Sequence, residues 1–184
     1  DPVATLRATA WVKCTSLYGV PTMFIAVLDQ QVAAELDFSS LRTGIMAGAT
    51  CPVETMKQVI DRLGMAEVSI CYGMTETSPA ASTQPVVFRG KPGSCGLPLP
   101  GIYIDIVALD DPHRVLAQGE TGEIRIKGPN VARGYWNRPG ESAETFIDGR
   151  FLSGDIGHMD EDGYVWVVDR KKDVVISGGF NVYP

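Results

Sequence analysis

The chain has 184 residues, of which 45% are apolar and 21% are charged. This composition is that of a globular protein, and it excludes an intrinsically disordered chain. The length allows one large domain or two small ones with a sizeable core. The formal net charge of -6 at pH 7 has the wrong sign for a protein whose main partner is nucleic acid.

Neither a membrane-spanning segment nor a secretory signal is recognisable in the sequence. The apolar run at residues 23–28 is far shorter than the roughly 18 residues that suggest a spanning helix. The chain opens on Asp1 without an initiator Met, so we expect it to begin inside a longer protein. The two histidines and the four cysteines lack the spacing of metal ligands, and the cysteines form no CxxC pair. These residues are His113, His158, Cys14, Cys51, Cys71 and Cys95. We therefore expect structural or surface histidines, reduced thiols and a cytoplasmic location.

Up to about residue 78, short β-branched runs alternate with longer amphipathic ones, which is typical of βα units on a parallel sheet. The pattern predicts helices at residues 5–13, 22–31 and 52–63, and strands at 43–48 and 67–71. The second helix carries one apolar stripe and is expected to bury it against a core. That stripe consists of Phe24, Val27 and Leu28.

From about Gly90 the sequence becomes dense in Gly and Pro, and its period changes to two. This predicts antiparallel strands with one buried face. The strands are expected at residues 102–107, 123–127 and 164–168, with a hairpin that spans 151–168 and turns at 161–163. The predicted fold class is therefore α/β, with a parallel βαβ layer followed by an antiparallel β subdomain. The expected domain limits are 1–88, 89–168 and 169–184.

Small and polar residues follow both predicted parallel strands: Gly48 and Ala49 after the first, and Tyr72, Gly73, Thr75 and Glu76 after the second. Ligands of open α/β sheets bind beyond the carboxyl ends of the strands. An aromatic ring, a glycine, hydroxyls and a carboxylate suit a nucleotide with a metal ion, and a flat base fits between the Gly48 backbone and the Tyr72 ring. Each segment alone is also consistent with a plain turn, which composition by itself favours.

A second candidate group lies on the predicted hairpin. Asp155 follows a flexible glycine, and a carboxylate accepts two hydroxyl hydrogen bonds of the kind that a ribose diol offers. Arg170 lies 15 residues later, across the hairpin, so both side chains reach one ligand if the strands pair. The simpler alternatives are a Gly-Asp turn and a solvated charge cluster at residues 169–173. Gly178 and Gly179 suit either a backbone nest for an anion or a narrow passage for a thin ligand.

These segments, in this order, resemble the AMP-forming acyl-CoA synthetases, a branch of the adenylate-forming enzymes. The resemblance runs from about residue 3 to the end of the chain. Ser153 departs from it conservatively, because Thr is commoner there. The matching segments are Tyr-Gly-Met-Thr-Glu at 72–76, Gly-Glu-Ile-Arg-Ile-Lys-Gly and Arg-Gly-Tyr-Trp within 122–136, Ser-Gly-Asp at 153–155, and Asp-Arg-Lys-Lys-Asp-Val-Val-Ile-Ser-Gly-Gly-Phe-Asn-Val-Tyr-Pro at 169–184.

The resemblance implies a ligase that activates a carboxylic or fatty acid as acyl-AMP on ATP and Mg²⁺, and then transfers the acyl group to CoA. It also implies a role for each candidate residue. Tyr72 and Gly73 would bind adenine opposite Gly48 and Ala49, Thr75 the α-phosphate, Glu76 the Mg²⁺ ion, Asp155 and Arg170 the ribose, and Gly178 and Gly179 the pantetheine, while Lys172 would be the hinge and Tyr18, Val20, Met23 and Phe24 would line the acyl tunnel.

The resemblance further implies a phosphate-binding loop upstream of Asp1 and a catalytic lysine beyond Pro184. We therefore expect the chain to be the later part of an N-terminal domain with the hinge, and to be inactive by itself. The alternatives are a non-catalytic nucleotide-binding fragment or pseudoenzyme, an adenylation domain of a peptide synthetase, and a chain with further residues outside the structure. The Gly-Val-Pro-Thr segment at 19–22 favours a fatty-acyl ligase over a peptide synthetase. No sequence feature indicates an oligomeric state.

Overall fold

The computed structural model describes residues 1–85, 90–173, 175–177 and 180–182. The chain forms two compact units, which are described separately: residues 1–71 with 84–93, and residues 72–83 with 94–184. The domain limits expected from the sequence stay a prediction. In the described ranges, none of the helices combines the length and the apolar character that crossing a membrane requires.

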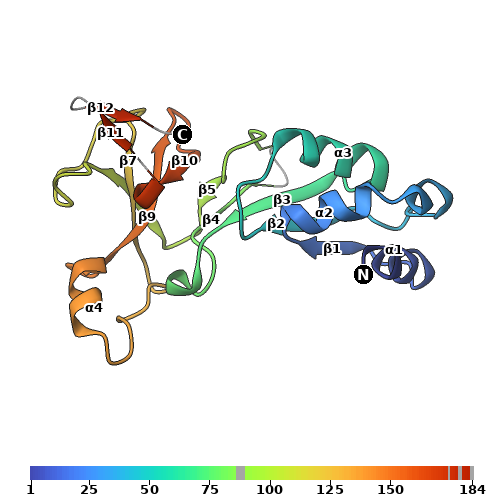
Figure 1. Ribbon diagram of the computed structural model, residues 1–184, viewed down its shortest axis with the longest axis horizontal. Coiled ribbons are helices and arrows are strands. Elements are labelled where there is room, and N and C mark those ends of the chain that lie inside the picture. Colours follow the sequence, from blue (N-terminus) through green and yellow to red (C-terminus); the bar gives the residue numbers. More distant parts are fainter. Residues whose placement is uncertain (86–89, 174, 178–179, 183–184) are drawn as a thin grey trace. The chain divides into compact units, whose positions relative to one another are not determined.

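The first unit contains a parallel sheet and the helices that accompany it (Figure 1, blue to green). Its elements are α1 (Pro2–Trp11), β1 (Ser16–Gly19), α2 (Pro21–Leu28), the 3-10 helix η1 (Gln31–Glu35), β2 (Thr43–Ala47), α3 (Val53–Leu63) and β3 (Glu67–Tyr72), of which only Tyr72 belongs to the second unit. β2 pairs in parallel with β1 on one side and with β3 on the other. The predicted parallel layer is thereby confirmed.

One hydrophobic core joins the helices of the first unit to its sheet. The predicted stripe of α2 is buried in this core, beside Leu6 of α1, Met46 of β2, Val59 of α3 and Ile70 of β3. The ends of the helices follow local chemistry. The Asp1 carboxylate accepts a hydrogen bond from the Ala4 amide at 3.0 Å and caps α1. Gly64 ends α3 at a φ of 71°, where a side chain would be strained.

Three details of the first unit differ from the predictions. The helix expected at residues 5–13 spans Pro2–Trp11. The helix expected at residues 22–31 ends at Leu28, and a separate 3-10 helix begins at Gln31. The strand β1 was not predicted, because four residues are too few to show a period of two. Its pairing with β2 places Gly19 opposite Met46, so both strands end at the same edge of the sheet.

The second unit is built on an antiparallel sheet with the strand order β10-β9-β7-β6. Its elements are η2 (Thr75–Thr77), β4 (Ser82–Thr83), β5 (Leu97–Pro98), β6 (Tyr103–Val107), β7 (Gly122–Lys127), α4 (Pro139–Thr145), β8 (Phe146–Ile147), β9 (Arg150–Met159), β10 (Val165–Arg170), η3 (Lys171–Asp173), β11 (Val175–Ser177) and β12 (Phe180–Val182). β4 pairs with β5, β8 with β9, and β11 with β12. The predicted antiparallel subdomain and its hairpin are confirmed, whereas the short helix α4 was not predicted.

Two irregularities in the pairing shape the central strand β9. Between β7 and β9, the partner of Glu123 is Ile156 and the partner of Arg125 is Leu152. Residues 153–155 therefore bulge from the ladder. Between β9 and β10 the register shifts at Val167 and Asp169, so that the strand continues to Arg170, two residues beyond its predicted end.

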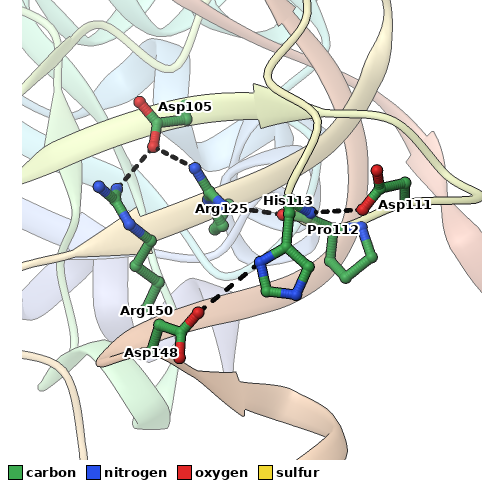
Figure 2. A network of polar contacts seen from close by, with 7 residues as sticks. All are labelled: Asp105, Asp111, Pro112, His113, Arg125, Asp148 and Arg150. Carbon is green, nitrogen blue, oxygen red and sulfur yellow. Dashed lines mark hydrogen bonds and ion pairs between the residues drawn. The ribbon is translucent and has the colours of Figure 1, made fainter.

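The prediction that only one face of this sheet is buried was wrong. Glu123 and Arg125 of β7 are 3% and 7% exposed, although they alternate with buried isoleucines. Figure 2 shows why Arg125 tolerates burial. Its guanidinium donates to Asp105 Oδ2 at 2.8 Å and to the Pro112 carbonyl at 2.7 Å, and Arg150 donates to the same Asp105 oxygen at 2.6 Å. Paired charges can be buried where lone ones cannot.

Candidate functional site

The bulge of β9 presents the Asp155 carboxylate at the edge of the hairpin. Gly154 takes a φ of 72°, a backbone conformation that glycine adopts without strain. The Gly154 amide donates to Glu123 Oε1 at 3.1 Å, and the Asp155 amide donates to Ser153 Oγ at 3.0 Å. The bulge is therefore fixed by hydrogen bonds at two successive amides.

Tyr72, at the end of β3, reaches this carboxylate although it lies 83 positions away in the sequence. Its hydroxyl donates to Asp155 Oδ2 at 2.9 Å. On the other side, Arg170 Nε lies 3.7 Å from Asp155 Oδ1, and the two residues are register partners in β9 and β10. The strand pairing that the prediction for Asp155 and Arg170 requires is confirmed, whereas their contact with one ligand stays a prediction. The aromatic and the acidic candidate residues thus form one group.

Burial governs the protonation of this group. It raises the pKa of the Asp155 carboxyl, while the Tyr72 hydroxyl and the Arg170 charge lower it. Burial also raises the pKa of Tyr72, and the neighbouring Asp155 charge adds to that rise. Tyr72 is therefore a neutral hydrogen-bond donor at neutral pH. Gly73 follows it in a crowded position, because a Cβ there would collide with the Pro79 carbonyl oxygen.

The residues after β3 form η2, which carries the expected phosphate and metal residues. Thr75 is exposed and Glu76 is half-buried. The Glu76 carbonyl oxygen accepts from the Ala132 amide at 2.8 Å, and its Oε1 accepts from the Tyr135 hydroxyl at 2.7 Å. Asn130 Nδ2 donates to the carbonyl oxygens at both ends of the following turn, Thr77 and Ala80, at 2.8 Å and 2.7 Å. The segment after β7 thus holds η2 in place.

A pocket of about 440 Å³ opens beside these residues, within the second unit. Its lining includes Glu76, Tyr135, Ser153, Gly154 and Lys171. Two groups at this side of the unit could ligate a metal ion, the Glu76 carboxylate and the neighbouring Thr75 hydroxyl. Both ligate through hard oxygen atoms. Oxygen donors of this kind are those that Mg²⁺ prefers, so the residues present fit the implied ion.

In the first unit, Gly48, which is expected to contact a base, lies beside Val20, which is expected to line the acyl tunnel. The two residues follow β2 and β1. Gly48 is exposed, with a φ of 87°, and a Cβ there would lie 3.3 Å from Val20 Cγ1. The loop expected to contact a base therefore adjoins a residue expected to contact the acid. Ala49 is also exposed. Both residues belong to a different unit from Tyr72, so the sandwich of a base between them stays a prediction.

The four expected acyl-tunnel residues differ in exposure. Tyr18 and Val20 are 61% and 44% exposed, and Met23 is half-buried. Phe24 has no exposed surface and belongs to the hydrophobic core of the first unit. A tunnel lined by the first three residues requires no rearrangement of that core, whereas one lined by Phe24 does.

The remaining expected residues lie near the end of the chain. Lys172 is exposed in η3, directly after β10. Gly178 and Gly179 lie outside the described residues. Of the histidines, His113 Nδ1 lies 3.7 Å from Asp148 Oδ2 at the surface, and His158 stacks on Trp166. The four cysteines are free.

Three residues of this site were missed by sequence reasoning: Glu123, Tyr135 and Lys171. Lys171 Nζ lies 2.7 Å from Glu123 Oε2. Glu123 alternates with isoleucines in the same way as Arg125 and Lys127 do, so no signal in the sequence distinguishes it. The partners of Tyr135 and Lys171 lie 59 and 48 positions away, and no local pattern indicates contacts over such separations.

Comparison with known proteins shows which family this chain resembles. The family model described as "AMP-binding enzyme" matches residues 1–136. A long-chain-fatty-acid–CoA ligase of Bacillus subtilis is 38% identical over the whole chain, and a feruloyl-CoA synthase of Amycolatopsis is 42% identical. The crystal structure of ATP-bound MatB from Rhodopseudomonas palustris superposes with a TM-score of 0.90 at 36% identity and covers all of this chain. The chain spans 32%, 37% and 36% of these three proteins.

Proposed function

Because the chain belongs to the AMP-binding enzyme family, we propose that it forms the nucleotide-binding part of an ATP-dependent ligase that joins a carboxylic acid to CoA. The hydrogen bond between Tyr72 and Asp155, with Arg170 beside it, carries the proposal. An aromatic ring and a carboxylate held together suit adenosine, since the ring face stacks on the base and the carboxylate accepts from the ribose hydroxyls.

In the first half-reaction, a carboxylate oxygen of the acid attacks the α-phosphorus of ATP, and pyrophosphate leaves. Two anions must approach each other, so the barrier is largely electrostatic. Thr75 donates its hydroxyl to the α-phosphate, and Glu76 holds the cation that accompanies the nucleotide. Bound Mg²⁺ supplies charge neutralisation at the phosphates. Asp155 and Tyr72 fix the nucleoside so that the α-phosphate lies beside η2.

In the second half-reaction, the thiol of CoA attacks the acyl carbonyl, the thiol proton is released, and AMP leaves. Lys172 lies directly after β10, and we assign it as the hinge about which a following domain rotates between the two half-reactions. Rotation of a domain re-lines one site for two reactions. Gly178 and Gly179 are proposed to line the path of the pantetheine arm.

The relatives support an acid substrate and leave its class open, because one is named for long-chain fatty acids and another for ferulic acid. We propose an aliphatic or aromatic acid that enters beside Val20 and Met23. Val20 adjoins Gly48, and this proximity supports an acid site next to the proposed nucleotide loop. The 184 residues alone are proposed to bind adenine nucleotide without forming acyl-AMP.

The test is ATP–pyrophosphate exchange by the whole protein that contains this chain, with acetate, benzoate, ferulate, and medium-chain and long-chain fatty acids. Exchange with one class of acid supports the proposal and identifies the substrate. No exchange with any acid, but retained ATP binding, would indicate a pseudoenzyme. The 184 residues alone are assayed beside it, and exchange by them would overturn their proposed inactivity.

The role of Asp155 is tested separately by Asp155→Ala. Loss of a hydrogen bond to a charged group costs about 1.5–3 kcal/mol, which predicts an ATP affinity lower by roughly tenfold to a hundredfold. The matched control is Asp110→Ala, because the Asp110 side chain is 79% exposed and pairs with Arg114 at the surface. Equal ATP affinity in the two variants would contradict a ribose contact by Asp155.

The hinge is tested by Lys172→Pro, since proline fixes φ and restricts rotation there. We expect nearly normal pyrophosphate exchange together with a strong loss of thioester formation. Equal loss in both half-reactions would argue against a hinge at Lys172.

A further inference from the structure

Tyr135 forms a hydrogen bond with Glu76, and the proposed mechanism gives this contact no role. Its hydroxyl donates to Glu76 Oε1 at 2.7 Å, while the amide of Ala132, three residues earlier, donates to the Glu76 carbonyl oxygen at 2.8 Å. One short segment therefore contacts both the side chain and the backbone of Glu76. Within the ranges that the structure describes, Tyr135 is the only donor that reaches this carboxylate.

The Tyr135 ring is itself anchored to the sheet. It packs edge-on against Phe146 with ring centroids 5.3 Å apart, and Phe146 packs against Phe151 at 5.3 Å. Phe151 is only 2% exposed in β9. The Tyr135 amide donates to Ser142 Oγ at 2.8 Å, which ties the same residue to α4. The direction of the hydroxyl is thus set by packing and by the backbone.

The hydroxyl acts as a neutral donor at neutral pH. The ordinary pKa of a tyrosine hydroxyl is about 10, well above neutral pH. A donor that occupies one carboxylate oxygen leaves the second oxygen free for a cation. A free glutamate side chain loses rotamer freedom when it is fixed, and in this arrangement part of that loss has already been incurred on folding.

We propose that Tyr135 is a positioning residue that holds the Glu76 carboxylate in the orientation in which its second oxygen ligates the divalent cation of the bound nucleotide. The inference rests on the proposed function and adds a residue to it. Carboxylates that ligate a metal are commonly held by such an outer hydrogen bond, and its removal typically costs 10–100-fold in metal affinity. Tyr135→Phe removes the hydroxyl alone and keeps the ring against Phe146.

The experiment measures the affinity of Mn²⁺, a spectroscopic substitute for Mg²⁺, for the whole protein in the presence of ATP. Free Mn²⁺ is followed by electron paramagnetic resonance. The variants are Tyr135→Phe, Glu76→Gln and the double variant. Tyr103→Phe is the matched control, because Tyr103 lies in the same unit and is 66% exposed. The affinity for ATP without metal is measured in parallel, since a general structural disturbance would lower it as well.

We expect Tyr135→Phe to weaken Mn²⁺ binding about tenfold, with metal-free ATP affinity unchanged and the Tyr103→Phe control like the wild type. Glu76→Gln weakens Mn²⁺ binding further, and adding Tyr135→Phe to it has no additional effect, because Tyr135 acts through Glu76. Unchanged Mn²⁺ affinity in Tyr135→Phe, or an equal loss in the Glu76→Gln background, would overturn the inference.

Failure of the proposed function gives a different result. If the wild-type protein does not bind Mn²⁺ with ATP, the proposed function and this inference are both wrong. If the wild-type protein binds Mn²⁺ and Glu76→Gln weakens the binding while Tyr135→Phe does not, only the role of Tyr135 is overturned.

Discussion

Lys171 Nζ lies 2.7 Å from Glu123 Oε2, and this ion pair joins a lysine side chain that is 44% exposed to a carboxylate that is only 4% exposed. The other Glu123 oxygen accepts from the Gly154 amide. The residue before the proposed hinge is therefore linked, through one buried carboxylate, to the bulge that presents Asp155.

Lys171→Met is expected to lower the free energy of unfolding, because it leaves the buried Glu123 carboxylate without its counter-charge. Lys171 is partly solvated, so we expect roughly 1–3 kcal/mol, measured by urea unfolding of the whole protein. Lys127→Met is the matched control, since Lys127 is an exposed lysine of β7. Equal unfolding midpoints for the two variants would show that the ion pair contributes no stability.

Asp155 is expected to make stability fall as the pH rises. Its pKa is raised above 3.8 in the native protein, so between 3.8 and the native pKa the native state binds more protons than the unfolded state. Asp155→Asn removes this titration, and its advantage over the wild type should therefore grow as the pH rises through that window. The measurement is urea unfolding at a series of pH values from 3.5 to 7.

Two variants sharpen this pH experiment. Tyr72→Phe removes a donor that lowers the Asp155 pKa, so the fall in stability should extend to higher pH. Asp110→Asn is the control, because the Asp110 pKa is lowered by its hydrogen bond to Arg114, which gives an effect of opposite sign. A difference between Asp155→Asn and the wild type that is flat with pH would contradict the raised pKa.

Val20→Ala and Phe24→Ala are expected to separate substrate contact from core packing. Phe24 has no exposed surface, and its truncation should lower the free energy of unfolding by about 3–5 kcal/mol. Val20 is 44% exposed, so Val20→Ala should change stability by at most about 0.5 kcal/mol. If Val20 contacts the acid, the KM of the Val20→Ala variant for the acid should be roughly fivefold to tenfold higher than that of the wild type.

The control for Val20→Ala is Val168→Ala, which removes the same atoms from a valine that is 49% exposed in the other unit. An acid KM that changes in neither valine variant would remove Val20 from the acid site. A small stability loss in Phe24→Ala would show that the core of the first unit collapses around the gap.

Asp105→Ala is expected to be the most destabilising change at the polar network of the antiparallel sheet (Figure 2). It leaves the Arg125 guanidinium, which is only 9% exposed, without a carboxylate, and loss of a buried ionic partner costs about 3–5 kcal/mol. Arg150→Ala should cost less, because Arg150 is 30% exposed. Urea unfolding measures the free energy of unfolding of both variants. Equal decreases in Asp105→Ala and Arg150→Ala would contradict this account.

The sequence determined the elements of this protein wherever their signal is local. The apolar stripe of α2, the end of α3 at Leu63 and the turn between β9 and β10 each depend on residues close together in the chain, and each was predicted correctly. The spacing of Asp155 and Arg170 also predicted that they lie across the hairpin from each other, because hairpin pairing fixes which residues face each other across the turn. The segments that match the AMP-forming acyl-CoA synthetases together identified the family.

Only the tertiary structure decided which side chains hold these candidates in place. The contacts of Tyr72 with Asp155, of Tyr135 with Glu76 and of Lys171 with Glu123 join residues 83, 59 and 48 positions apart. No period or turn signal covers such distances, because each contact joins elements that only the folded chain brings together. A bulge shifts every later pairing by a residue or more, so the contact between Asp155 and Tyr72 follows from the assembled sheet and from no single segment.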